Sequence, residues 1–265
     1  AWTSGNTAVA TINSASGVVT PVAAGTATMT YTVTGTGGCA NATATRTVTV
    51  TAAPTAGTLS GTQTICSNGT TTFGSSVSGG AWTSGNTAVA TINSATGVVT
   101  PVAAGTATMT YTVTGTGGCA NATATRTVTV TAAPSAGTLS GTQTICSNGT
   151  TTFGSSVSGG AWTSGNTAVA TINSATGVVT PVAAGTATMT YTVTGTGGCA
   201  NATATRTVTV TAAPTAGTLS GTQTVCSNGT TTFASTVSGG AWTSGNTAVA
   251  TINSASGVVT PVAAG

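Results

Sequence analysis

The chain has 265 residues and a formal net charge of +3, which comes from three arginines, with no Asp, Glu, His or Lys. General acid–base catalysis needs a side chain that titrates near the working pH, and a hydroxyl nucleophile needs a base beside it, so we expect no enzyme. Calcium and magnesium need carboxylate oxygens, and zinc needs His or several free thiolates, so we expect no metal and no cofactor. Three isolated arginines also argue against a nucleic-acid partner, and no apolar run reaches the roughly 18 residues that would span a bilayer.

One 80-residue unit fills the chain: residues 1–80, 81–160 and 161–240 are near-identical, and residues 241–265 begin a fourth copy. Only five positions of the unit vary, and each substitution keeps size and polarity almost unchanged. Faithful copying lengthens a protein without diversifying it. The repeat therefore predicts a structural surface or filament protein and not an enzyme.

The predicted module boundaries lie at the Thr-Ala-Ala-Pro segments that end at Pro54, Pro134 and Pro214. A proline followed by small residues lacks both ladder donors and core side chains, which is typical of a junction. Residues 55–134 and 135–214 are then complete modules, 1–54 is the C-terminal part of one module, and 215–265 is the N-terminal part of another. Such short junctions predict a linear array, and we expect the chain to be a stretch of a longer one.

Within module 55–134 the hydrophobic pattern has a period of two, with threonine on one side and apolar residues on the other. The predicted strands are Thr70–Phe73, Ala88–Ile92, Val98–Pro101, Thr106–Val113 and Thr123–Val130. Asn68-Gly69 predicts a tight turn, and Gly97 closes a hairpin loop because it can adopt positive φ. Short strands with frequent turn signals and no helical period predict a small all-β sandwich.

The large apolar side chains of each module form the predicted core, because a domain this small must bury its few bulky residues. In module 55–134 they are Leu59, Phe73, Trp82, Ile92, Val98, Val99, Met109 and Tyr111. An aromatic patch that stacks on sugars is the alternative interpretation.

Each repeat carries one arginine, at Arg46, Arg126 and Arg206. The alternation places Arg126 on the apolar side of its strand, so either a bulge shifts the register or the guanidinium reaches out at the end of the core. With no carboxylate side chain to pair with, we expect backbone carbonyls, side-chain oxygens or an aromatic face as partners. Besides this structural role within the module, each of the three arginines is a candidate for a contact to a neighbouring module or chain.

The six cysteines alternate at spacings of 27 and 53 residues. Bonds within modules would join Cys66 to Cys119 and Cys146 to Cys199, which leaves Cys39 and Cys226 to pair with cysteines outside the chain. Bonds across the junctions would instead join Cys39 to Cys66, Cys119 to Cys146 and Cys199 to Cys226. Loop entropy does not decide between the schemes, and the first is preferred because it needs no partner domain. Either scheme predicts an extracellular or cell-surface protein.

The segment 81–111, AWTSGNTAVATINSATGVVTPVAAGTATMTY, resembles the bacterial immunoglobulin-like group 2 domain of invasin- and intimin-type surface proteins. Its matching elements are Trp-Thr-Ser-x-Asn, Ala-Val-Ala-Thr-Ile, Gly-Val-Val-Thr and Val-Ala-Ala-Gly-Thr-Ala-Thr, which recur in the other copies. The cysteine-bearing segments are similar to those of very large Bacteroidota surface proteins. The resemblance implies tandem Ig-like sandwiches with a spacer or adhesive role.

These patterns together predict an extracellular filament or cell-surface stalk that associates with copies of itself. Its near-uncharged, threonine-rich faces would meet little electrostatic repulsion on side-by-side packing. The alternative is an adhesin that binds glycans or another surface, with ice binding as a remote option suggested by the Thr-x-Thr rows.

Overall fold

The computed structural model describes all 265 residues and contains 28 strands and no helix. No segment therefore forms a helix that could cross a membrane. The chain divides into two compact units, one made of Ala1–Ala136 with Thr192–Thr203, the other of Gly137–Tyr191 with Ala204–Gly265.

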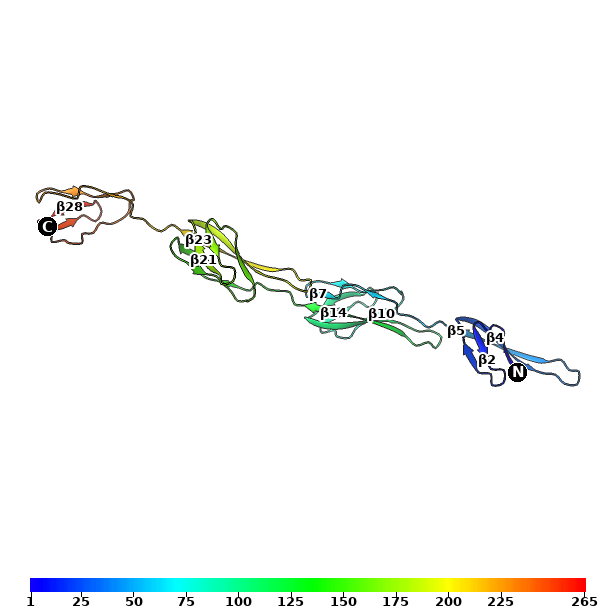
Figure 1. Ribbon diagram of the computed structural model, residues 1–265. Coiled ribbons are helices and arrows are strands. Elements are labelled where there is room, and N and C mark those ends of the chain that lie inside the picture. The colour runs from blue at the N-terminus through cyan, green and yellow to red at the C-terminus, as the bar shows by residue number, and fades with distance from the viewer. The chain divides into compact units, whose positions relative to one another are not determined.

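The larger sheet of module 55–134 has four strands in the order β10-β13-β14-β7, of which β7, β10 and β14 are labelled in Figure 1. They are β10 (Ala81–Ser84), β13 (Gly105–Val113), β14 (Ala122–Thr131) and β7 (Thr64–Cys66). β13 and β14 form a long antiparallel hairpin, whereas β7 runs parallel to β14 with Cys66 opposite Thr131. The end of β14 and the end of β7 therefore lie side by side.

The opposing layer consists of a three-stranded sheet in the order β11-β12-β8 and the two-stranded ladder β6-β9. Their bounds are β6 (Leu59–Ser60), β8 (Thr71–Thr72), β9 (Gly74–Ser75), β11 (Ala90–Ile92) and β12 (Val98–Pro101). The hairpin between β11 and β12 turns at Gly97, whose φ of 71° is the predicted left-handed conformation.

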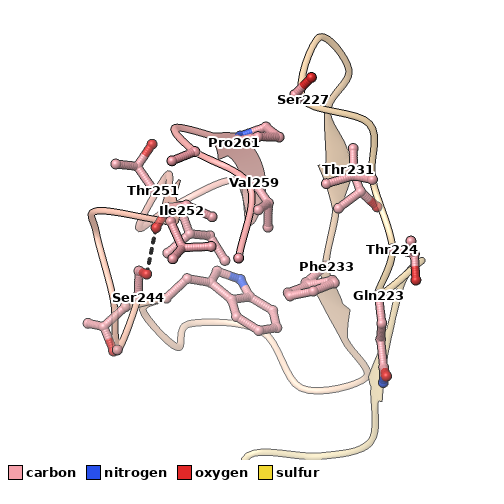
Figure 2. A pocket seen from close by; sticks show the side chains of 18 of the residues that line it. Gln223, Thr224, Ser227, Thr231, Phe233, Ser244, Thr251, Ile252, Val259 and Pro261 are labelled. Carbon is pink, nitrogen blue, oxygen red and sulfur yellow. Dashed lines mark hydrogen bonds between the residues drawn. The ribbon is translucent and has the colours of Figure 1, made fainter.

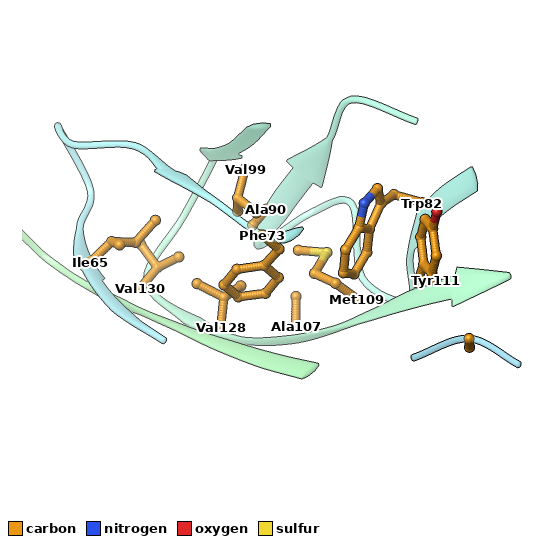
Figure 3. Close-up of a cluster of buried hydrophobic side chains, with 11 residues drawn as sticks. Ile65, Phe73, Trp82, Ala90, Val99, Ala107, Met109, Tyr111, Val128 and Val130 are labelled. Carbon is orange, nitrogen blue, oxygen red and sulfur yellow. The ribbon is translucent and has the colours of Figure 1, made fainter. Parts of the chain in front are cut away.

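The core lies between these layers and is built from the apolar side of the alternating strands (Figure 3). Phe73 and Met109 are fully buried at its centre, and the Trp82 ring lies 4.9 Å from that of Tyr111. The Tyr111 hydroxyl donates to the Val77 carbonyl and accepts from the Gly80 amide, both at 2.8 Å, so its polar end is satisfied. This confirms the core interpretation of the aromatic residues.

The second complete module repeats these elements with the same topology. Its strands are β15 (Leu139–Ser140), β16 (Thr144–Cys146), β17 (Thr151–Thr152), β18 (Gly154–Ser155), β19 (Ala161–Ser164), β20 (Ala170–Ile172), β21 (Val178–Pro181), β22 (Gly185–Val193) and β23 (Ala202–Thr211). The order β16-β23-β22-β19 matches that of the first module, with β16 parallel to β23.

Residues 1–54 and 215–265 contain only part of the repeat's elements. The first segment has β1 (Trp2–Ser4), β2 (Ala10–Ile12), β3 (Val19–Pro21), β4 (Gly25–Val33) and β5 (Ala42–Val50). The second has β24 (Leu219–Ser220), β25 (Thr231–Thr232), β26 (Ala234–Ser235), β27 (Ala250–Ile252) and β28 (Val258–Pro261).

The chain is thus all-β and consists of tandem Ig-like β-sandwich modules, as the sequence predicts. One core prediction is wrong: Val98 is 37% exposed, because β12 alternates and turns Val99 inward in its place. The predicted boundaries at Pro54, Pro134 and Pro214 lie in segments without strands and stay predictions.

Candidate functional site

The long hairpin of each module carries a cysteine at its tip, held there by local sequence. In the loop between β22 and β23, the Asn201 side chain accepts the Gly195 amide at 2.9 Å, and the same bond joins Asn121 to Gly115. Gly197 and Gly198 both have positive φ, which side chains disfavour, so the Gly-Gly pair permits the turn that presents Cys199.

A second cysteine lies at the opposite end of the same sheet, on a surface formed by the ends of β7 and β14. The Ser67 amide donates to the Thr131 carbonyl at 2.8 Å, and the Ser67 hydroxyl accepts the Ala133 amide at 3.0 Å. These bonds fix the segment that follows Cys66. We call Cys66, Ser67 and Thr131, with the equivalent residues of other repeats, the cysteine face.

The hairpin tip of one repeat meets the cysteine face of the preceding repeat. Cys66 and Cys199 form a disulfide with a Cα–Cα distance of 4.8 Å and a sequence separation of 133 residues. The Cys199 sulfur lies 3.6 Å from the carbonyl oxygens of both Thr131 and Ala132. A Cβ at Gly197 would overlap the Thr131 side chain, so the hairpin approaches this face closely enough to require glycine.

The preceding hairpin makes the same approach without a disulfide. The Cys119 thiol donates to the Thr51 carbonyl at 3.5 Å and lies 3.8 Å from that of Ala52. A Cβ at Gly117 would overlap the Thr51 side chain, as one at Gly197 would overlap that of Thr131. Docking of the hairpin therefore recurs where no covalent bond holds it.

The predicted disulfides differ from the one observed and are corrected. Cys66–Cys119 is not formed because these residues lie at opposite ends of β14, whose ten residues extend over roughly 30 Å. A disulfide requires Cα atoms within about 7 Å. Cys146–Cys199 fails for the same reason in the second module, and the alternative scheme across the junctions is absent too.

Four cysteines are free thiols in the structure. Cys39 and Cys226 are exposed, whereas Cys119 and Cys146 are half-buried. The pairing of Cys39 and Cys226 with cysteines outside this chain stays a prediction. The parallel pairing of β7 with β14 is not among the features predicted from the sequence. This pairing places Cys66 at the end of the sheet away from the hairpin of its own module.

Arg126 lies inside its own module. Its Nε donates to the Gly61 carbonyl and its Nη1 to the Leu59 carbonyl, each at 3.1 Å, and its Cζ lies 5.5 Å from the centroid of the Phe73 ring. β14 pairs with β13 without a bulge, and Arg126 lies opposite the buried Met109. The suggested register shift is therefore wrong, and the guanidinium lies against the Phe73 ring. Carbonyls and an aromatic face are indeed its partners.

The second complete module repeats this arrangement around Arg206, which donates to the Leu139 and Gly141 carbonyls and lies over Phe153. The suggested contact of Arg126 and Arg206 to a neighbouring module stays a prediction, since each guanidinium has five N–H donors and makes three of these bonds within its module. Arg46 is exposed, because residues 1–54 contain no counterpart of Leu59, Gly61 or Phe73.

A cavity of about 860 Å³ lies in residues 215–265 between Phe233 and the β27–β28 hairpin (Figure 2). Phe233 and Val259 face the open space there, as their equivalents Phe73 and Val99 face the core of module 55–134. In the complete module Met109, Val128 and other residues of the long hairpin fill this position. The cavity is consequently the open side of a sandwich core and not a ligand site.

The outer side of the long hairpin is a row of paired threonines. Those of the first complete module are Thr106 with Thr129, Thr108 with Thr127, Thr110 with Thr125, and Thr112 with Thr123. Most are exposed, and none has a charged neighbour on the same strands except Arg126, which points to the other side. The surface can therefore form hydrogen bonds without desolvating a charge.

No protein-family model matches the chain, and comparison with curated proteins found no match. Among solved structures, the chain is similar to the C-terminal 282-residue fragment of intimin in complex with the intimin-binding domain of the translocated intimin receptor. Identity is 17% and the TM-score 0.37, with 58% of this chain and 63% of that chain covered.

A second similar structure is Drosophila N-cadherin EC1-4, at 9% identity and a TM-score of 0.27, covering 79% of this chain and 66% of that one. The chain thus spans less than two thirds of the length of either structure. Neither similarity carries a functional argument, and the fold rests on the strands described above.

Proposed function

We propose that this protein is an extracellular structural repeat protein that forms a filament or cell-surface stalk and associates with copies of itself. The observation that carries the proposal is the Cys66–Cys199 disulfide, which joins one repeat to the hairpin of the next. A covalent bond between repeats resists unfolding of either one alone. Such a bond suits a protein that transmits load or sets a distance.

The disulfide also stabilises the folded chain, which suits an exposed structural protein. Closing a loop of 133 residues removes conformational freedom from the unfolded chain, which in the chain-entropy model stabilises the folded state by about 5 kcal/mol. Disulfides persist in oxidising compartments. The proposed location is therefore outside the cell or on its surface.

The proposal extends to the family and to the absence of catalysis. The Trp-Thr-Ser start, the Gly-Val-Val-Thr hairpin and the long Thr-rich strand support membership of the bacterial immunoglobulin-like group 2 domains. The side chains that most often serve as general bases are absent, since the chain has no Asp, Glu, His or Lys. We propose that it is not an enzyme and needs no cofactor.

Self-association would use the paired threonine face. Unpaired charges usually oppose the close packing of protein surfaces, and this face has none. Hydroxyl groups of two such faces could exchange hydrogen bonds as they do with water.

Negative-stain electron microscopy of the oxidised protein tests the proposal. We expect regular fibres thicker than a single sandwich, which is about 20–25 Å across. Thr106→Lys with Thr123→Lys, at two positions that are exposed and do not lie opposite each other, should leave the fold intact and prevent thickening, because like charges would meet on the packed faces.

Val102→Lys is the matched control, since Val102 is exposed but lies outside the threonine face. It should leave the fibres unchanged. Thin isolated particles from the unsubstituted protein would overturn self-association and favour the adhesin alternative, in which the faces bind glycans or another surface.

A further inference from the structure

We propose that the Cys66–Cys199 disulfide is a load-bearing link, which lets tension cross two modules without passing through residues 67–198. Tension in a chain follows its covalent bonds, and this bond joins two residues that are 133 positions apart in the sequence. The residues between them form a closed loop, and a loop attached at a single bond carries no net tension. The inference goes beyond the proposed function, because it concerns force along one chain and does not depend on association between copies.

The loop contains most of both complete modules. It includes β8 to β14 of the first module and β15 to β22 of the second. Large side chains that are fully buried in the two cores lie within it, among them Phe73, Met109, Phe153 and Met189. A force on the ends of the chain therefore does not act on the segments that carry these side chains.

Tension reaches the disulfide through β7, which ends at Cys66. This strand is extended and parallel to β14, with Thr64 opposite Thr129. The Thr129 amide donates to the Gln63 carbonyl at 2.6 Å, and the Gln63 side-chain amide donates to the Thr127 carbonyl at 3.1 Å. An extended strand gains little length under tension, so β7 can carry the load while it stays paired with β14.

Tension leaves the disulfide through β23, which follows Cys199 closely in the sequence. β23 is paired on both sides, with β16 and with β22. Residues of a strand rise by roughly 3.3 Å each, close to the limit of about 3.6 Å for a stretched chain. The path from β7 across the disulfide to β23 therefore consists largely of backbone that is already extended, and it resists lengthening.

Reduction of the disulfide would place the shielded residues under load. A dithiol such as dithiothreitol gives up two protons and two electrons and becomes a cyclic disulfide, and Cys66 and Cys199 become thiols. Tension would then run through residues 67–198, whose strands separate as the force rises. Fully stretched, the 133-residue separation spans about 450 Å. The disulfide therefore sets the maximum length of the chain.

Force spectroscopy of the full chain in optical tweezers tests the inference. Cysteine-free peptide tags at both ends attach the chain to the beads. The test variant keeps the Cys66–Cys199 bond, which thiol counting verifies, and has four substitutions at the free cysteines: Cys39→Ser, Cys119→Ser, Cys146→Ser and Cys226→Ser. The matched control carries these four changes together with Cys66→Ser and Cys199→Ser, so the two variants differ only in the bonded pair.

We expect the test variant to reach about half the extended length of the control, because only residues 1–66 and 199–265 lengthen. Dithiothreitol added at constant force should lengthen the test variant by about 450 Å and leave the control unchanged. Equal lengths of the two variants before reduction would overturn the inference.

The course of the lengthening shows whether the loop stays folded under load. At a force where the control unfolds in resolved steps, we expect the reduced test variant to lengthen in several steps, as strands that were shielded until then separate. A single immediate step of the full length would show that the loop had already unfolded, and the shielding would be refuted.

Electron microscopy reads the proposed self-association separately. Equal lengths in the tweezers from a protein that forms thick fibres would refute the load path and leave self-association standing. The expected difference in length from a protein that never forms thick fibres would support the load path and refute lateral association.

Discussion

Residues 1–54 and 81–134 have almost the same sequence, differing only at Ser16 and Thr96, yet their side chains are buried to different extents. Tyr31 is 41% exposed, whereas Tyr111 is 5% exposed. Arg46 is exposed, whereas Arg126 is half-buried and donates hydrogen bonds. The strands are nevertheless the same, with β4 and β5 paired in the register of β13 and β14.

The long hairpin and its register therefore form without residues 55–80 or their equivalents. The burial of its side chains, in contrast, depends on residues 55–80. The Trp2 and Tyr31 rings lie 4.9 Å apart, as do those of Trp82 and Tyr111. Only the second pair has Phe73 beside it, with 6.0 Å between the Phe73 and Trp82 centroids. Residues 55–80 therefore convert a preformed half-sandwich into a closed core.

The largest expected effect comes from removing the ring that closes this core. Phe73→Ala should destabilise module 55–134 by about 3–5 kcal/mol, because a fully buried aromatic side chain is lost and a cavity remains. The module would then resemble residues 1–54. Hydrogen exchange read by mass spectrometry measures this loss. The peptides around Thr96 and Thr176 have the same sequence and mass, so their shared signal should split into a fast population from module 55–134 and a slow one from module 135–214.

Phe233→Ala is the matched control. Phe233 is only half-buried in a segment whose core is open, so the same deletion should accelerate exchange much less. Equal effects at Phe73 and Phe233 would contradict the view that the long hairpin closes the core against this ring.

The next largest effect concerns the arginine. Arg126→Met keeps an unbranched apolar stem but removes the guanidinium and its hydrogen bonds to the Leu59 and Gly61 carbonyls. We expect a loss of about 1.5–3 kcal/mol, the usual contribution of hydrogen bonds to a charged group. The substituted peptide has its own mass, so its exchange can be followed apart from the identical peptide around Arg206.

Arg46→Met should leave exchange unchanged, because Arg46 is exposed. A comparable loss at both positions would show that the arginine acts through its charge and not through the carbonyls of residues 59–61.

A smaller effect is expected at the tyrosine. Tyr111→Phe removes the hydroxyl that bridges Val77 and Gly80 and should cost about 1–2 kcal/mol, since the Gly80 amide loses its acceptor in a half-buried position. Exchange of the peptide that contains Gly80 should accelerate. Tyr31→Phe, on the exposed ring, should change nothing, and acceleration there would contradict the comparison.

The sequence predicts those features that depend on alternation and turn chemistry. The strands at 98–101, 106–113 and 123–130, the Gly97 turn and the buried Phe73 all follow from local patterns. The parallel pairing of β7 with β14 does not follow from local patterns, because no feature of Thr64–Cys66 predicts that it pairs with a strand 65 residues away. The disulfide depends on that pairing and was therefore missed.

The repeat itself conceals the correct cysteine pair. Spacings of 27 and 53 suggest neighbours in sequence, whereas the observed separation of 133 is 53 plus one 80-residue repeat. The separation is longer because each hairpin docks on the preceding repeat and not on its own. It is a property of tertiary contacts, and loop entropy varies too slowly with length to reveal it.

The smallest expected effect is that of pH. The free energy of unfolding changes with pH only where the folded and unfolded chains bind different numbers of protons. Asp, Glu and His are the residue types that ordinarily titrate within or close to the interval from about pH 5 to pH 7, and the chain has none of them. The thermal midpoint of unfolding, measured by circular dichroism, should therefore stay constant over this interval, with no rise or fall in either direction. The exchange difference between residues 1–54 and 81–134, corrected for intrinsic rates, should also be unchanged. A midpoint that moves with pH would reveal a group whose protonation differs between the folded and the unfolded chain. The difference between residues 1–54 and 81–134 would then have an electrostatic component besides packing and hydrogen bonds.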